Sequence, residues 1–186
     1  MSEVTAVPLR PITKGSLVKL WVGVAVVIGL GLGAAYYGTA RQVAMAMSPE
    51  DFLAANAKHG GVITTPSGLQ YEVLKEGSGA RPTTGDIVLV DYEGKLASGE
   101  AFDASARHGG PQPLPLQGMI PGWTEGLQLM NTGSKYRFWM PPALAYGETG
   151  APPRIPPNSV IIFDVTLNAV MPPQGMGAMP EGHGGM

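Results

Sequence analysis

Several aromatic residues and one carboxylate of this chain are of types, and at positions, that could form a functional site. Five aromatic residues stand beside turns or at strand positions able to line a cavity: Tyr92, Phe102, Trp123, Tyr146 and Phe163. Asp103 is the one carboxylate embedded among them. This set of residues could line an apolar cavity.

The usual catalytic constellations are missing from the sequence. There is no phosphate-binding glycine-rich loop, no dinucleotide fingerprint, no histidine pair at helical spacing for zinc and no Gly-x-Ser-x-Gly elbow. The chain has no cysteine, which excludes disulfides, a thiol nucleophile and thiolate metal ligands. Of the three histidines only His108 lies inside the main domain, and His183 has no second ligand type near it. We therefore expect no metal and no cofactor.

A short predicted helix carries Trp123. Trp123, Leu127 and Met130 recur at i, i+4 and i+7, and Pro121 and Gly122 form the tight turn that leads into them. A helix of about three turns is marginal alone, so it must be buried against something larger. Because β segments flank it in the sequence, we expect a sheet wrapped on this helix. The indole could then form the floor of a pocket, although an ordinary core position also fits.

Alternation of apolar and polar residues predicts strands on both sides of this helix. A hairpin turn is expected at Ser98-Gly99. Residues 104–115 are predicted to be a loop, and residues 143–157 form a second one that is too apolar for an ordinary solvated connection. The predicted strands cover residues 69–73, 87–96, 102–103, 135–140 and 160–170.

The first 40 residues predict a membrane anchor. Residues 1–19 are a basic lead-in, and residues 20–40 carry no charge over a length that matches the roughly 30 Å core of a bilayer. Three Lys or Arg residues precede the span and Arg41 follows it, which predicts a cytoplasmic amino terminus and an exported remainder. A cleaved signal and a buried core helix remain alternatives, with a small-residue triplet at 44–46 as the cleavage site.

The rest of the chain divides into a spacer, a main domain and a tail. Ser48 and Pro49 are typical of a helix start, so a helix over residues 49–58 is expected within a spacer covering 41–60. Residues 61–171 form the main domain. Residues 172–186 are a Gly/Pro/Met tail expected to be disordered. A net charge of −2 gives no support for nucleic-acid binding.

Five motifs stand in order along the main domain, at residues 90–94, 99–105, 120–127, 145–147 and 155–165. In their order and spacing they resemble those of the FKBP-type peptidyl-prolyl cis–trans isomerases. Residues 52–61 and 67–71 further resemble the bacterial branch that includes the macrophage infectivity potentiator proteins.

The resemblance implies an α+β fold, with a five-stranded antiparallel half-barrel sheet around one short helix and a prolyl pocket between them. It implies that Trp123 floors this pocket, with Asp103 at its edge. The Tyr146 hydroxyl and the backbone N–H of Ile120 would bind a substrate carbonyl. Three positions depart from the family pattern and are expected to weaken macrolide binding: Gln112, Ala151 and Arg154. The remaining lining residues would be Tyr92, Phe102 and Phe163 on the walls, Met119 and Ile120 at the helix start, and Ile155 on the overhanging loop.

The function implied is cofactor-free acceleration of rotation about X-Pro bonds by desolvation and hydrogen bonding. No general acid or base is expected, so the rate should depend weakly on pH near neutrality. The predicted partners are proline-containing polypeptide clients, macrolides such as tacrolimus or rapamycin, and the bacterial inner membrane, with the catalytic domain in the periplasm. A secreted or periplasmic form after cleavage is the alternative location. A proline-segment binding module or chaperone with little turnover is the alternative function.

Overall fold

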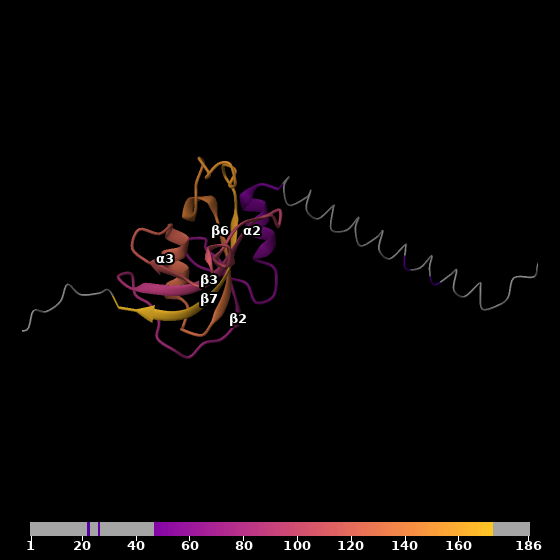
Figure 1. Cartoon of the computed structure of the whole chain (residues 1–186). Coiled ribbons are helices and arrows are strands. Elements are labelled where there is room, and N and C mark those ends of the chain that lie inside the picture. The colour runs from indigo at the N-terminus through magenta and orange to yellow at the C-terminus, as the bar shows by residue number, and fades with distance from the viewer. Residues whose placement is uncertain (1–21, 23–25, 27–46, 173–186) are drawn as a thin grey trace, which may run out of the picture. The chain divides into compact units, whose positions relative to one another are not determined.

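The computed structural model describes residues 47–172 together with Val22 and Val26, both of which are helical (Figure 1). The chain divides into two units, Met1–Val43 and Ala44–Met186, and every strand described here belongs to the second. Apart from Val22 and Val26, the predicted membrane segment 20–40 lies outside the described residues, as does the tail from residue 173. Among the residues that are described, no helix has both the length and the apolar character needed to cross a membrane.

One antiparallel sheet forms the body of the second unit. Its strands follow the order β1-β2-β6-β7-β3-β4, and β5 also pairs with β3. The α+β class and the predicted strand positions are confirmed. The helices are α2 (Pro49–Asn56), η1 (Ser105–His108), α3 (Pro121–Gln128) and η2 (Pro142–Leu144). The strands are β1 (Ile63–Thr64), β2 (Gln70–Lys75), β3 (Ile87–Leu96), β4 (Ala101–Ala104), β5 (Gln112–Pro115), β6 (Lys135–Met140) and β7 (Ile161–Met171).

The predicted count of five strands was wrong, because the sheet has seven. One extra strand is the two-residue β1, and the other is β5, inside the segment predicted to be a loop. Both β4 and β5 pair with β3, β4 through residues 93–95 and β5 through residues 87–90. Pro113 and Pro115 lack the N–H of a regular strand, which favoured a loop in the sequence. An edge strand tolerates proline because one side of its backbone needs no partner.

Helix α3 carries the apolar face predicted for it. Trp123, Leu127 and Met130 are buried, although the helix ends at Gln128, earlier than expected. Gly122 and Gly126 bring the helix close to β6 and the following loop. A Cβ atom at Gly122 would lie 2.6 Å from the Met140 sulfur, and one at Gly126 would lie 2.8 Å from the Phe138 ring. Small residues are therefore required on the side of α3 that faces β6.

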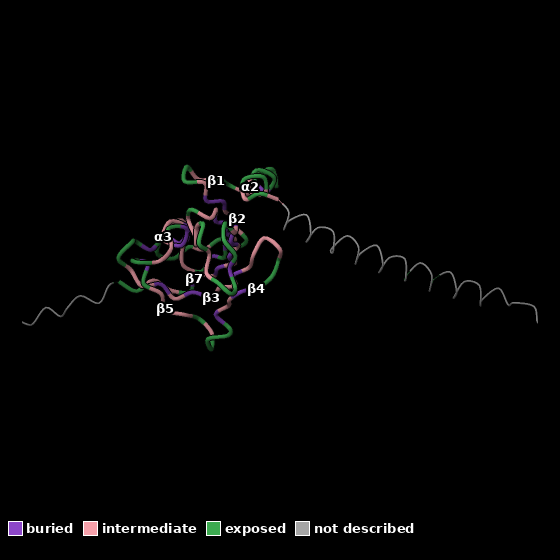
Figure 2. The backbone as a smooth tube through the Cα atoms, turned by 90° about the horizontal axis from the view of Figure 1, so that it is seen from above, coloured by how far each residue is buried: buried purple, intermediate pink, exposed green. Residues whose placement is uncertain are grey.

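Helix α2 begins as predicted, with the Ser48 hydroxyl accepting a hydrogen bond from the Asp51 N–H. Two hydrogen bonds attach it to β2. The Asn56 side chain donates to Gln70 Oε1 at 2.8 Å, and Gln70 Nε2 donates to the Leu53 carbonyl at 2.9 Å. Figure 1 shows α2 and α3 on opposite sides of β6, and Figure 2 shows much of α2 as exposed surface. The helix expected within the spacer is thus attached to the sheet.

Candidate active site

Four aromatic rings from four different elements form one cluster, centred on Phe163 of β7. The Phe163 ring centroid lies 5.0 Å from Trp123 of α3, 5.6 Å from Phe102 of β4 and 6.1 Å from Tyr92 of β3, with interplanar angles of 72° to 83°. Tyr92 and Trp123 also meet edge to face at 5.5 Å. Such arrangements place the positive edge of one ring against the negative face of another. The structure therefore brings together four of the predicted site residues.

Gly94 makes room for this cluster. It pairs with Phe163 across β3 and β7 and with Asp103 across β3 and β4. A Cβ atom at this position would lie 2.6 Å from both the Phe102 and the Phe163 ring. A glycine inside a strand is a signal of close approach that the sequence offered, but its role was not predicted.

Asp103 is held at the edge of the cluster by two side chains. The Tyr92 hydroxyl donates to Oδ2 at 2.8 Å, and His108 Nε2 lies 2.9 Å from Oδ1. Because an ionised carboxylate can only accept, the histidine nitrogen is the donor. Tyr92 is fixed in turn by its backbone N–H, which donates to the hydroxyl of buried Ser105 at 3.1 Å. The roles of His108 and Ser105 were not predicted.

The pKa values of Tyr92, Asp103 and Tyr146 are shifted at this site. Burial, the hydrogen bond to Asp103 and its negative charge raise the pKa of Tyr92 to about 12. Burial alone would raise the pKa of Asp103, but the hydrogen bonds from His108 and Tyr92 outweigh it and lower that pKa below its usual value. Burial, followed by the charge of Asp103, raises the pKa of Tyr146. At neutral pH Asp103 is therefore an ionised carboxylate, and Tyr92 and Tyr146 are neutral phenols.

The other predicted residues surround the same core. Ile155 is buried, and Met119, Ile120 and Tyr146 are half-buried and pack against the core. The Ile120 carbonyl accepts hydrogen bonds at the start of α3. Within residues 47–172, neither its N–H nor the Tyr146 hydroxyl donates a hydrogen bond. Both donors are therefore available to a ligand.

Two arginines meet at Phe102: Arg107, whose role was not predicted, and Arg154, one of the three departures from the family pattern. Nη1 of Arg107 donates to the Phe102 carbonyl at 3.0 Å, and Nη1 of Arg154 donates to the same oxygen at 3.2 Å. Gln112, another departure from the family pattern, turns back on its own loop and donates to the Gly110 carbonyl at 2.7 Å. Its amide therefore does not extend the aromatic cluster.

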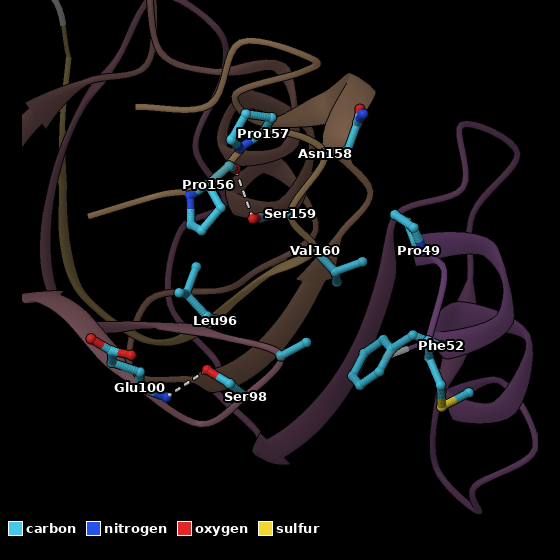
Figure 3. A pocket seen from close by; sticks show the side chains of 12 residues that line it. Pro49, Phe52, Leu96, Ser98, Glu100, Pro156, Pro157, Asn158, Ser159 and Val160 are labelled. Carbon is cyan, nitrogen blue, oxygen red and sulfur yellow. Dashed lines mark hydrogen bonds between the residues drawn. The ribbon is translucent and has the colours of Figure 1, made fainter. Parts of the chain in front are cut away.

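A cavity of about 370 Å³ lies elsewhere, between α2, the β3–β4 turn and the loop before β7. Figure 3 shows the Phe52 ring of α2 pointing into it, with Leu96 and Pro156 on the other side. None of the predicted site residues lines this cavity.

Two family models match parts of this chain. The family model described as "FKBP-type peptidyl-prolyl cis-trans isomerase" matches residues 79–168, and the model "Domain amino terminal to FKBP-type peptidyl-prolyl isomerase" matches residues 38–73. The crystal structure of FkpA from Escherichia coli is similar with a TM-score of 0.65 at 35% identity, over 87% of this chain and 75% of that one. The chain belongs to the FKBP-type peptidyl-prolyl isomerase family. The resemblance stated from the sequence is confirmed.

Curated FKBP-type relatives fall in the predicted bacterial branch. FkpA from Aeromonas hydrophila is 54% identical over 128 residues, which is 69% of this chain and 47% of that protein. The isomerase Mip from Coxiella burnetii is 48% identical over 119 residues, 64% of this chain and 52% of its own length. The chain thus spans about half the length of these relatives.

Proposed function

We propose that this protein is a peptidyl-prolyl cis–trans isomerase that accelerates rotation about X-Pro bonds in exported or envelope proteins. One observation carries the proposal: a cluster of four aromatic rings with a fixed carboxylate at its edge, in a member of the FKBP-type family. Trp123 is the floor for the proline ring, and Tyr92, Phe102 and Phe163 are the walls. This assignment of the pocket rests on the family motifs and on the contacts between the rings.

The barrier to be lowered comes from amide resonance. Rotation about the peptide bond costs about 18–20 kcal/mol, and an uncatalysed X-Pro bond rotates over tens of seconds or more. The planar amide is more polar than the twisted one, so an environment without water destabilises the ground state more than the transition state. Phe102, Trp123 and Phe163 are 7%, 4% and 3% exposed, which supports a site of this kind.

Hydrogen bonds orient the substrate in this proposal, and no proton is transferred. The Ile120 N–H and the Tyr146 hydroxyl bind substrate carbonyls, since neither has a partner within residues 47–172. Asp103 acts as an oriented negative charge at the edge. Its lowered pKa keeps it ionised at neutral pH, and the raised pKa of Tyr146 keeps that phenol neutral. Ile155 and Met119 complete the apolar rim.

The proposed location is the bacterial inner membrane, with residues 20–40 as a single anchor and residues 61–171 as a periplasmic isomerase domain. The uncharged run and the basic lead-in support it. A relative called "Outer membrane protein MIP" from Legionella longbeachae, 42% identical over 119 residues, is consistent with an envelope role. Alkaline carbonate extraction tests the anchor: the intact chain should stay with the membranes. Release of the uncleaved chain contradicts it, and a shortened soluble chain supports the cleaved form.

Proline-limited refolding of a model protein tests the activity. The full chain in detergent should accelerate the slow phase, and tacrolimus or rapamycin should compete. Macrolide binding should also change Trp123 fluorescence, against a background from Trp21 and buried Trp139. A saturable change without acceleration favours the alternative, a proline-segment binding module, for which the supporting observation is Gln112, a departure from the family pattern whose amide bonds its own loop. Absence of both effects contradicts the proposed pocket.

A further inference from the structure

Two positive side chains from different parts of the chain meet beside the aromatic cluster. Arg107 lies on η1, and Arg154 lies on the loop between η2 and β7. Both guanidinium groups donate to the carbonyl oxygen of Phe102, at 3.0 and 3.2 Å. A carbonyl oxygen has two lone pairs, so this oxygen is fully used. The Phe102 ring meanwhile contacts Phe163 at 5.6 Å, so both charges lie beside the wall of the proposed prolyl pocket.

Neither arginine forms an ion pair with a residue that the structure describes. The adjacent carboxylate, Asp103, has one oxygen bonded to Tyr92 and the other to His108. A guanidinium group carries five N–H donors, of which each arginine uses one on Phe102. Both residues are exposed, so the remaining donors can reach a ligand.

We propose that Arg107 and Arg154 form a subsite for a carboxylate, so that the isomerase favours proline segments with an acidic residue next to the proline. The inference rests on the proposed function and names its substrate class. When a proline ring enters the aromatic cluster, the neighbouring residue lies one Cα spacing, about 3.8 Å, away along the rim. A Glu or Asp side chain there meets two planar forks whose geometry suits a carboxylate.

The alternative explanation is that the arginines only fasten the overhanging loop to β4. One hydrogen bond from each side chain would serve that purpose, and glutamine can supply it without a charge. A purely structural role predicts that losing the charges slows all substrates equally. The proposed role predicts a change in the ratio between acidic and neutral substrates. The ratio is therefore the decisive measurement.

The experiment compares tetrapeptides that differ only beside the proline: Ala-Glu-Pro-Phe against Ala-Gln-Pro-Phe, and Ala-Leu-Pro-Glu against Ala-Leu-Pro-Gln. Exchange spectroscopy by NMR gives kcat/KM for each with the full chain in detergent. We expect glutamate to be favoured about fivefold in one of the two pairs at low salt. The preference should shrink toward one at about 0.5 M salt, because screening weakens contacts between exposed charges.

The double variant R107Q/R154Q should lose the preference, and R107K/R154K should keep only part of it, because lysine retains the charge but not the planar fork. R81Q is the matched control. Arg81 is also exposed, but it lies in the connection between β2 and β3 and bonds the Asn131 side chain. A ratio near one for both pairs in the wild type, or a preference that survives in R107Q/R154Q, overturns the inference. If no peptide is accelerated, the proposed function fails instead. Calorimetric Kd values for the same peptides then decide whether the carboxylate subsite exists.

Discussion

The Tyr92 hydroxyl donates a 2.8 Å hydrogen bond to Oδ2 of Asp103 and so joins β3 to β4 at the edge of the aromatic cluster. With His108 on Oδ1, both oxygens of the carboxylate are bonded before any substrate arrives. Asp103 is thus held in one orientation, as an electrostatic group requires if it is to act without reorganising. A proton-transferring group would instead need a pKa near the working pH, whereas the pKa of Asp103 is lowered.

Asp103→Asn should keep the fold and part of the activity. Between pH 6 and 8 the wild-type kcat/KM should change less than about threefold, because Asp103 has a lowered pKa and stays ionised. His108 can donate from Nε2 both as the cation and as the Nε2–H tautomer, so the bond to Asp103 does not require a charged imidazole. The measurement is a pH profile of kcat/KM for a proline tetrapeptide. A bell-shaped wild-type profile that disappears in Asp103→Asn would show that proton transfer limits the reaction.

The same carboxylate should stabilise the fold in a pH-dependent way. A carboxyl whose pKa is lower in the folded state contributes stability that is present above its ordinary pKa, about 3.9, and is lost as the pH falls through the lowered value. The free energy of unfolding in urea should therefore favour the wild type over Asp103→Asn at pH 6, and the difference should narrow below about pH 4. A difference that is constant from pH 6 to 2 contradicts the ionised, hydrogen-bonded Asp103.

Tyr92 should titrate with a pKa of about 12. Because this folded-state pKa exceeds the ordinary value of about 10, the stability it contributes is complete below about pH 10 and is lost as the pH rises toward 12. Tyrosinate absorbance of the wild type minus that of Tyr92→Phe isolates the group. In Asp103→Asn the pKa should fall, since the bond and charge of the carboxylate both raise it. An unchanged value there would leave burial as the sole cause.

Gly94→Ala adds only one methyl group, but it should lower both the stability and the activity of the protein. The added Cβ would lie 2.6 Å from both the Phe102 and Phe163 rings, so the rings must shift at a cost of about 1–3 kcal/mol. We expect a lower thermal midpoint and a loss of kcat/KM beyond about tenfold. Gly60→Ala is the control, because no atom lies within 4 Å of its Cβ position. Equal behaviour of the two variants would contradict the close packing at Gly94.

The sequence predicted the elements better than their contacts. Alternation located β3 and β7, whose buried faces are long, and the motif order located the aromatic residues. Local patterns could not predict β5, since the prolines of an edge strand and of a loop look alike. They also could not predict that Arg107 and Arg154, 47 positions apart by number, share one carbonyl. That contact depends on how the overhanging loop folds over β4, which only the tertiary structure determines.

A comparison of two buried phenylalanines can distinguish a pocket residue from an ordinary core residue. Phe102 belongs to the aromatic cluster, whereas Phe138 of β6 lies against Tyr136 and the face of Gly126. Truncating either to alanine removes a buried ring and should cost about 3–5 kcal/mol of unfolding free energy. Only Phe102→Ala also opens the proposed pocket to water.

At a temperature where circular dichroism shows both variants folded, Phe102→Ala should lose kcat/KM by at least about a hundredfold. Phe138→Ala should lose less than about tenfold. The reason is that desolvation of the substrate amide requires the Phe102 ring, whereas the Phe138 ring only packs against α3 at Gly126. If both variants lose activity in proportion to their loss of stability, Phe102 is an ordinary core residue and the pocket must be sought elsewhere on the molecule.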